Sequence, residues 1–279
     1  MKQLFSMGAA VLLAATAMTP WSPTAMAGET LDRVMSSKTL TLSSDPEYPP
    51  QSFLNDQNEM DGFDVGVARE IAKRMGAELK IVTPAWEIIT AGNWGGRWDI
   101  SVGSMTPTTA RAKVLDFPAV YYYTPAAFAV HKDSSAASSA DLNGMKFGVC
   151  GGCTYEAYLN KDLVIDAEGT PPFGYDVTAG SIRTYETDIN VLDDLRLGDG
   201  ARLDAMLSAR PTIDEAIKNG YPVKVVGDAA FYEPLSVAVD KGDPEFSAKV
   251  AEIVKKMHED GTLTALSIKW YGTDFTTAK

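Results

Sequence analysis

The segment at residues 99–111 (DISVGSMTPTTAR) groups residue types that bind a small anion. Its apolar part, residues 98–105, predicts a buried strand, and the polar part predicts a turn and a short helix that carries Arg111. A guanidinium binds a carboxylate through two parallel hydrogen bonds, and the Thr106 hydroxyl and the Ser104 backbone N–H can donate two more. The segment therefore predicts a carboxylate-binding site; an arginine on a polar surface turn is the alternative.

Strands and helices alternate along the chain and must position this segment. Short apolar runs predict strands at 40–43, 79–82, 98–105, 126–130, 146–149, 203–207, 223–226 and 235–239. Apolar residues at helical spacing predict helices at 64–76 (with Asp64 as the N-cap), 188–197, 211–220, 244–260 and 262–270, and a weaker helix after Pro84. Alternation of this kind indicates an α/β fold with largely parallel sheets.

Residues 1–27 have the pattern of a secretory signal peptide. Lys2 precedes an apolar run at 8–18, and the small residues Ala25 and Ala27 predict cleavage after residue 27. The apolar run is shorter than the roughly 18–20 residues that a membrane span needs, no later segment qualifies, and no cysteine near the cleavage point could carry a lipid. The chain is therefore expected in an exported, oxidising compartment, most simply a bacterial periplasm.

Composition indicates an acidic globular protein. Removing 27 of the 279 residues leaves 252, enough for one large or two medium domains. Losing Lys2 takes the formal net charge from −12 to −13, and without a Lys/Arg-rich block such a chain is a poor partner for nucleic acid or an anionic membrane. Its two histidines, His131 and His258, lie far apart, so a histidine metal site is not expected. The sequence offers no cofactor-binding motif either, so no cofactor is expected.

Cys150 and Cys153 flank two glycines where a predicted strand meets a helix that begins near Thr154. In an oxidising compartment this pair predicts a structural disulfide. A redox-active pair at a helix start is one alternative. Half of a metal site is another, although the sequence holds no second cysteine or histidine pair to complete it.

Five segments together resemble the periplasmic amino-acid-binding proteins of ABC importers, solute-binding protein family 3. They are DPEYPP at 45–50, GFDVGVAREIA at 62–72, residues 99–111 with the following 116–117, RLDA at 202–205, and the stretch 260–272 from DGTLT to KWYG. The resemblance covers almost the whole chain after residue 27. It implies the type II periplasmic binding protein-like fold, in which two hinge strands join two mostly parallel sheets and the ligand lies between two lobes.

The resemblance also implies domain limits. Lobe 1 would be residues 28–123 plus 235–279, and lobe 2 residues 124–234. The hinge segments would be residues 121–125 and 231–234. Closure of such lobes is driven by contacts that form only when both touch the ligand.

Several site residues follow from the resemblance. It gives the ligand carboxylate to Arg111, Thr106 and the Ser104 backbone, as the residue types alone suggest. Tyr48 and Phe63 match aromatic positions that sandwich the ligand carbon chain, although core packing is the alternative for Phe63. Asp45 matches an acid that meets a polar or cationic head group, and the turn at Cys153 and Thr154 matches a Gly-Thr turn whose amides face the ligand.

The sequence departs from this family at the ammonium site. Relatives usually place an aspartate shortly after the strand predicted at 203–207, where this chain has Ala209. An unpaired ammonium in a closed cleft costs several kcal/mol, so Asp188 is the expected substitute. Helix capping by Asp188 or Thr187 is the alternative. Arg210 could instead meet a second anionic group, which keeps dicarboxylates and opine-like ligands open.

The leading hypothesis is a monomeric periplasmic component of an ABC transporter that captures a polar or basic amino acid, or a related carboxylate-bearing solute, for a membrane permease. One alternative is an enzyme similar to cyclohexadienyl dehydratases, for which Glu47, Glu87 and Glu156 are the available acids. Another is an accessory protein that serves an exported dehydrogenase.

Overall fold

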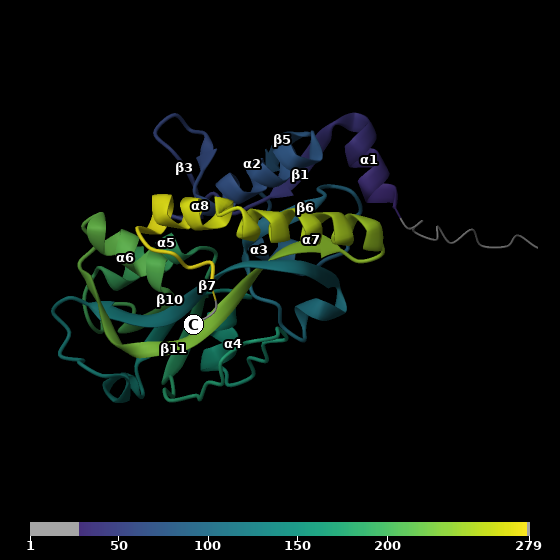
Figure 1. The fold of residues 1–279 in the computed structure, drawn as a ribbon. Coiled ribbons are helices and arrows are strands. Elements are labelled where there is room, and N and C mark those ends of the chain that lie inside the picture. The colour runs from purple at the N-terminus through teal and green to yellow at the C-terminus, as the bar shows by residue number, and fades with distance from the viewer. Residues whose placement is uncertain (1–27, 278–279) are drawn as a thin grey trace, which may run out of the picture.

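Two long strands, β7 (Leu115–His131) and β11 (Val223–Asp240), cross the molecule and join its two halves (Figure 1). They pair antiparallel along most of their length, with Val223 opposite His131 and Asp240 opposite Leu115. This structure is a computed structural model that describes residues 28–277, so the predicted signal peptide lies outside the described residues. Because both crossing strands continue into both halves, the main sheet is continuous, in the order β5-β1-β6-β11-β7-β10-β8-β9.

The first half holds the N-terminal strands and the C-terminal helices. Strands β5 (Glu78–Val82) and β6 (Ile100–Met105) flank β1 (Thr39–Ser43) in parallel, and β11 runs antiparallel to β6. Helices α2 (Phe63–Met75), α7 (Pro244–Glu259) and α8 (Thr262–Tyr271) lie together beside this part of the sheet (Figure 1). The remaining elements of this half are α1 (Glu29–Ser37), α3 (Trp86–Thr90) and a small sheet of β2 (Glu47–Tyr48), β3 (Ser52–Leu54) and β4 (Met60–Asp61).

The second half is built on the other edge of β7. Strand β10 (Ala205–Ala209) pairs antiparallel with β7 and parallel with β8 (Lys146–Cys150), which in turn pairs parallel with β9 (Ser181–Tyr185). The helices are α4 (Thr154–Leu159), α5 (Asp188–Leu195) and α6 (Arg210–Lys218). Short 3₁₀ helices occur at Arg111–Lys113 in the first half and at Ser139–Leu142 in the second.

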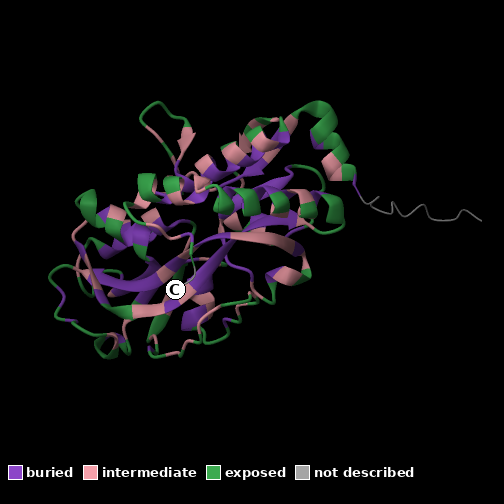
Figure 2. Cartoon of the chain, viewed as in Figure 1, coloured by how far each residue is buried: buried purple, intermediate pink, exposed green. Residues whose placement is uncertain are grey.

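Each half of the molecule has its own hydrophobic core. Phe63, Tyr121 and Tyr122 belong to the main cluster of the first half, whereas Phe128 and Phe147 belong to one in the second. Among the described residues, the buried members of each cluster come from one predicted lobe only. Buried residues concentrate in the central strands, and the outer faces of the helices are exposed (Figure 2). The lobe limits themselves remain a prediction.

Several sequence-based expectations need correction. The strands predicted at 126–130, 223–226 and 235–239 are parts of β7 and β11, which continue through Pro125 and Pro234. A proline removes one ladder donor but its φ is compatible with extended backbone, so a strand can pass through it. Helix α1 and strand β9 were not predicted.

The N-terminus of α2 also differs from the prediction. Gly62, not Asp64, is its N-cap, with φ of 123°. A Cβ there would lie 2.3 Å from the Gln51 carbonyl oxygen, so only glycine fits this close approach. The backbone N–H groups of Phe63 and Asp64 donate to the carbonyls of Pro50 and Gln51. These bonds hold the loop that follows Asp45 against the helix.

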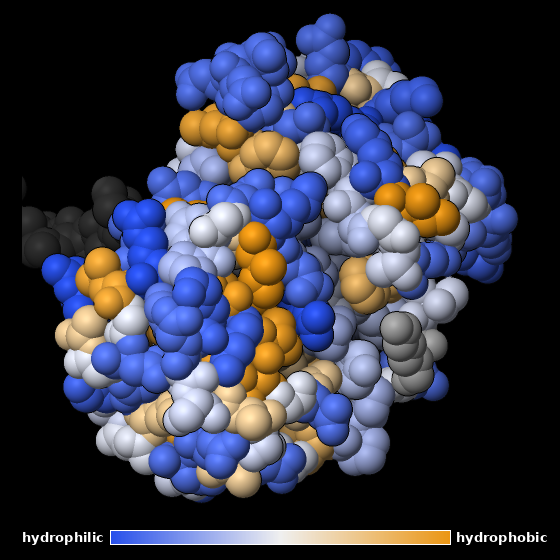
Figure 3. Space-filling view, turned by 90° about the vertical axis from the view of Figure 1, so that its left-hand side faces the viewer, coloured by the Kyte–Doolittle hydropathy of each residue, from blue (hydrophilic) through white to orange (hydrophobic). Residues whose placement is uncertain are grey.

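The surface is mostly hydrophilic. On the face shown in Figure 3, hydrophobic residues form a narrow central band and a few separate spots. Large exposed hydrophobic side chains include Leu54, Val164, Leu197 and Ile268, which come from different parts of the chain. Between residues 28 and 277, no helix combines the length and the apolar character needed to cross a bilayer.

Candidate functional site

A cavity lies between the two halves of the molecule. Nine of the ten residues singled out in the sequence line it: Asp45, Tyr48, Ser104, Thr106, Arg111, Cys150, Cys153, Thr154 and Asp188. Six others were not predicted as ligand-binding residues: Trp86, Gly103, Tyr155, Glu186, Thr187 and Glu233. These side chains come from both halves, so the cavity forms only when the halves lie against each other.

Contacts across the cleft hold the two halves together. Residues 107–109 and 164–166 exchange two backbone hydrogen bonds, from the Thr109 N–H to the Val164 carbonyl and from the Asp166 N–H to the Pro107 carbonyl. The Thr187 hydroxyl donates to the Glu47 carboxylate at 3.1 Å. The structure therefore describes a closed arrangement of the two halves.

Arg111 stands at one end of the cavity, on the 3₁₀ helix that follows β6. Its guanidinium donates to the carbonyl of Thr106 and, across the cleft, to that of Gly152, both at 2.9 Å. The guanidinium carbon also lies 5.3 Å from the centre of the Trp86 ring. Burial lowers the pKa of Arg111 to about 10, so the group stays charged at neutral pH. A guanidinium has five N–H donors, and these bonds leave others for a ligand.

Ser104 lines the cavity, but its backbone N–H is already bonded. That N–H donates to the Tyr121 hydroxyl at 2.9 Å, and the Ser104 hydroxyl donates to the Asp64 carboxylate at 2.7 Å. Tyr121 donates to the other oxygen of Asp64, also at 2.7 Å. Burial raises the pKa of Asp64 to about 7 against the effect of these bonds. The Ser104 amide thus belongs to a buried network in the first half, which differs from its predicted role as a ligand donor.

Glu233 binds the hydroxyls near Arg111. Its Oε1 accepts hydrogen bonds from Thr106, at 2.8 Å, and from Thr154, and its Oε2 accepts one from Tyr155 at 2.9 Å. Burial raises the pKa of this carboxyl, while the three hydroxyls and the charge of Arg111 lower it. The only sequence signal was an acid within the hinge segment predicted at 231–234.

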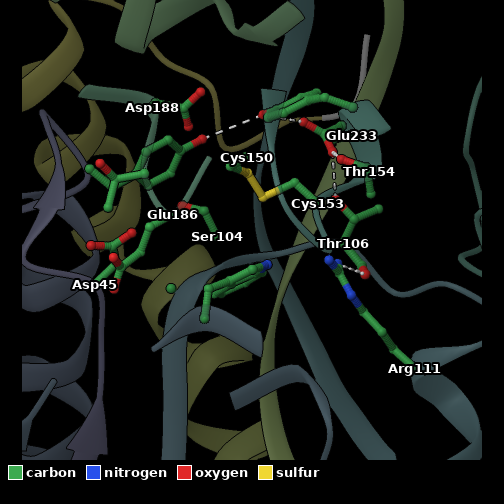
Figure 4. A pocket seen from close by; sticks show the side chains of 15 residues that line it. Asp45, Ser104, Thr106, Arg111, Cys150, Cys153, Thr154, Glu186, Asp188 and Glu233 are labelled. Carbon is green, nitrogen blue, oxygen red and sulfur yellow. Dashed lines mark hydrogen bonds between the residues drawn. A yellow bond between two sulfur atoms is a disulfide. The ribbon is translucent and has the colours of Figure 1, made fainter. Parts of the chain in front are cut away.

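A group of acids occupies the opposite side of the cavity. Figure 4 shows Asp45, Glu186 and Asp188 on one side, Arg111 and Thr106 on the other, and the disulfide between them. Burial raises the pKa of Asp45 to about 6 and that of Asp188 to about 7, and nearby acids add to both shifts. Concentrated negative charge in a sheltered site favours a positively charged group of a ligand.

Asp188 combines burial with an unused acceptor. It is 3% exposed, and its Oδ1 makes no hydrogen bond of ordinary geometry to the described residues, although the Ser208 hydroxyl lies near enough to lower the pKa of this carboxyl against burial. The helix-capping role is filled by Thr187 rather than Asp188. As the N-cap of α5, the Thr187 hydroxyl accepts a hydrogen bond from the Asn190 N–H. A buried carboxylate oxygen without a partner costs free energy, which a ligand ammonium would recover.

The two predicted aromatic residues lie in different surroundings. Tyr48 lines the cavity, and its hydroxyl is 3.4 Å from that of Tyr155 across the cleft. Phe63 does not line the cavity; it is fully buried between Tyr121, Tyr122 and Tyr271 in the core of the first half. Phe63 is the first residue of α2 and belongs to the buried face of this helix. The structure thus supports core packing rather than ligand contact for this ring.

The predicted disulfide between Cys150 and Cys153 is confirmed. It joins the end of β8 to the N-cap residue of α4, and both half-cystines line the cavity. Gly152, between them, has φ of 71° and offers its carbonyl to Arg111. The disulfide therefore fixes the turn that carries one partner of the arginine.

The possible second anion site at Arg210 is not formed. Arg210 binds Asp214 at 2.7 Å on the exposed surface of α6 and does not line the cavity. Ala209, the position at which the family resemblance led us to expect an aspartate, is the buried last residue of β10. Within residues 28–277, no group of three or more His, Cys, Asp or Glu side chains is arranged to hold a metal ion.

Two α/β halves, two crossing strands and a polar cavity between the halves define a two-lobe solute-binding protein. Comparison with known sequences agrees: residues 40–273 match the model of the bacterial extracellular solute-binding proteins, family 3. The chain belongs to this family.

Relatives of known name cover most of the chain. It is 32% identical to the L-cystine-binding protein TcyJ of Escherichia coli K12 over 249 residues, which are 88% of this chain and 87% of that protein. It is 26% identical to the L-arginine-binding protein of Pseudomonas aeruginosa over 246 residues, 85% and 89% of the two chains. Among solved structures, it resembles an ancestral amino-acid-binding protein described as a precursor of cyclohexadienyl dehydratase. That pair has a TM-score of 0.74 and 31% identity, and the match covers 87% of this chain and 100% of the other.

Proposed function

We propose that this protein binds an amino acid in the cleft and delivers it to the membrane permease of an ABC importer. The observation that carries the proposal is that Arg111 and Asp188, both buried, line opposite sides of one cavity. A free amino acid has a carboxylate and an ammonium, and these two residues offer one partner of the right charge to each. Tyr48 and Trp86, which also line the cavity, would cover the carbon chain between them.

The excess of acids supports a ligand with an additional positive charge. Asp45, Glu186, Asp188 and Glu233 line the cavity with one basic residue, Arg111. The relatives that bind L-arginine and L-cystine both take amino acids with more than one positively charged group. We therefore propose a basic amino acid or a diamino diacid such as cystine as the ligand class.

The setting of this activity follows from the family. Its members are extracellular solute-binding proteins, which supports export of this chain to the periplasm. We propose that residues 28–123 with 235–279 and residues 124–234 are the two lobes, and that the closed arrangement is the form a permease recognises. The N-terminal 27 residues would act as the cleavable signal peptide.

We propose that the protein is not an enzyme, although one similar structure is described as a dehydratase precursor. None of the three acids nominated for such chemistry, Glu47, Glu87 and Glu156, lines the central cavity. Glu47 binds the Thr187 hydroxyl, and Glu156 accepts the Gly152 N–H at 2.8 Å. Turnover of prephenate or arogenate by the purified protein would contradict this view.

Isothermal titration with L-arginine, L-lysine, L-cystine, L-glutamine and L-glutamate tests the proposal. At least one should bind with a Kd of about 1 µM or below. Arg111→Ala should then weaken that ligand by about a hundredfold or more, because a charge-assisted contact in a closed cleft is lost. Arg210→Ala is the matched control, because this arginine lies on the surface and outside the cavity. Equal affinities of wild type and Arg111→Ala would refute the proposed site.

A further inference from the structure

A carboxylate of the protein itself binds the hydroxyl groups at the arginine end of the cavity. The Thr106 hydroxyl comes from lobe 1 and the Thr154 and Tyr155 hydroxyls from lobe 2, and all three donate to Glu233. Figure 4 shows Glu233 beside Thr154 and Thr106, with Arg111 below them. These hydroxyls and Arg111 together form the donor set that a solute carboxylate would otherwise use.

Glu233 is bound as a ligand would be. It is 2% exposed and lies on β11, at the position opposite Thr124 of the other crossing strand. Three hydroxyl donors satisfy most of its acceptor capacity. The negative charge also faces Arg111, whose attraction for a second carboxylate it reduces.

We propose that Glu233 determines the ligand specificity of the cleft by occupying the hydroxyl part of the carboxylate site. A bound solute then has its α-carboxylate held by Arg111 without Thr106 and Thr154. A solute whose further carboxylate is not balanced by a second positive charge, such as glutamate, meets Glu233 at this end and Asp45 with Asp188 at the other. The cleft thus rejects acidic amino acids. This inference rests on the proposed function only for the identity of the solutes.

A purely structural role for Glu233, as a tie between the lobes, makes different predictions. If Glu233 only ties the lobes together, its removal lowers the stability of the protein. That removal then creates no new carboxylate site and leaves the order of ligand preference unchanged. Both consequences can be measured separately.

The first test uses chemical rescue. Glu233→Ala removes a group equivalent to acetate, so sodium acetate at up to about 100 mM should raise the thermal midpoint of this variant by a few degrees. Acetamide at the same concentration should not, and acetate should not have this effect on the wild type. Adding Thr106→Val to Glu233→Ala should reduce the rescue. Equal responses to acetate and acetamide would overturn the inference.

The second test uses Glu233→Gln, which keeps the size of the side chain and does not depend on Glu233→Ala folding. Titration should show that the ratio of the Kd for L-glutamate to the Kd for L-arginine falls at least about tenfold relative to wild type. An unchanged ratio would overturn the inference.

The two proposals fail in different ways. If the wild type binds no amino acid but acetate rescues Glu233→Ala, the proposed function fails and the internal carboxylate site stands. If the wild type binds L-arginine but neither test gives the expected result, only the inference on Glu233 fails.

Discussion

Asp188→Asn should weaken ligand binding and stabilise the protein at the same time. The reason is that Asp188 is buried, has a carboxylate oxygen without a partner and lines the cavity. A residue kept for ligand binding at the expense of folding is expected to show this opposition.

The loss of affinity follows from the charge pair that the proposal assigns to Asp188. Removing one partner of a buried, hydrogen-bonded charge pair costs about 2–5 kcal/mol. A loss of about 3 kcal/mol corresponds to more than a hundredfold in Kd. Titration at pH 8, where the wild-type carboxyl is ionised, gives the full effect.

The gain in stability follows from the raised pKa. Burial, with the charges of Asp45 and Glu233, raises the pKa of Asp188 from 3.8 to about 7, so the folded state holds this proton more tightly than the unfolded state. Stability contributed by this group is therefore present at low pH and is lost as the pH rises from about 4 to 7. Above pH 7 the ionised Asp188 carboxyl lowers the free energy of unfolding by on the order of 4 kcal/mol. Asparagine carries no charge and avoids this loss.

Chemical denaturation without ligand at pH 8 and at pH 4 measures how much the ionisation of Asp188 changes the free energy of unfolding. The variant should be more stable than wild type at pH 8 and close to it at pH 4. Asp193→Asn is the control, since Asp193 lies on the same helix but is partly exposed and outside the cavity. A variant that loses stability at pH 8 and keeps its affinity would show that Asp188 supports helix α5 rather than the ligand.

Three further predictions follow from the same site. Because the pKa of Asp188 is about 7 and that of Asp45 about 6, both carboxyls become protonated as the pH falls from 8 to 5, and affinity for L-arginine should fall about a hundredfold. An affinity that does not change with pH would contradict the acidic site. Replacing Cys150 and Cys153 by serine should lower the free energy of unfolding by about 2 kcal/mol, the loop-closure entropy expected for so short a loop. The replacement should also weaken ligand binding, because the turn that faces Arg111 is released. Unchanged affinity would show that the turn needs no cross-link. Phe63→Ala should lower the free energy of unfolding by about 3–5 kcal/mol but leave the Kd of the folded protein unchanged, and a selective loss of affinity would restore its predicted contact with the ligand.

The parts of the site that depend on local sequence were predictable. The buried strand followed by a polar turn and an arginine is found as β6 and the 3₁₀ helix of Arg111. The Cys150–Cys153 pair forms a disulfide, as its short spacing and an oxidising compartment predict. Such features depend on hydrophobic period, turn residues and short spacing, which a single stretch of sequence contains.

The roles that depend on distant partners were decided by the tertiary structure. Phe63 is in the core and the Ser104 amide is bonded because both meet Tyr121, nearly sixty and seventeen residues further along the chain. Glu233 lies beside Thr106 and Thr154 only because β11 passes between the two lobes. Sequence determined which side chains are capable of binding a charged solute. Which of them are free to do so depends on how the lobes pack, because a hydrogen-bonding group already paired inside the protein has little left to offer a ligand.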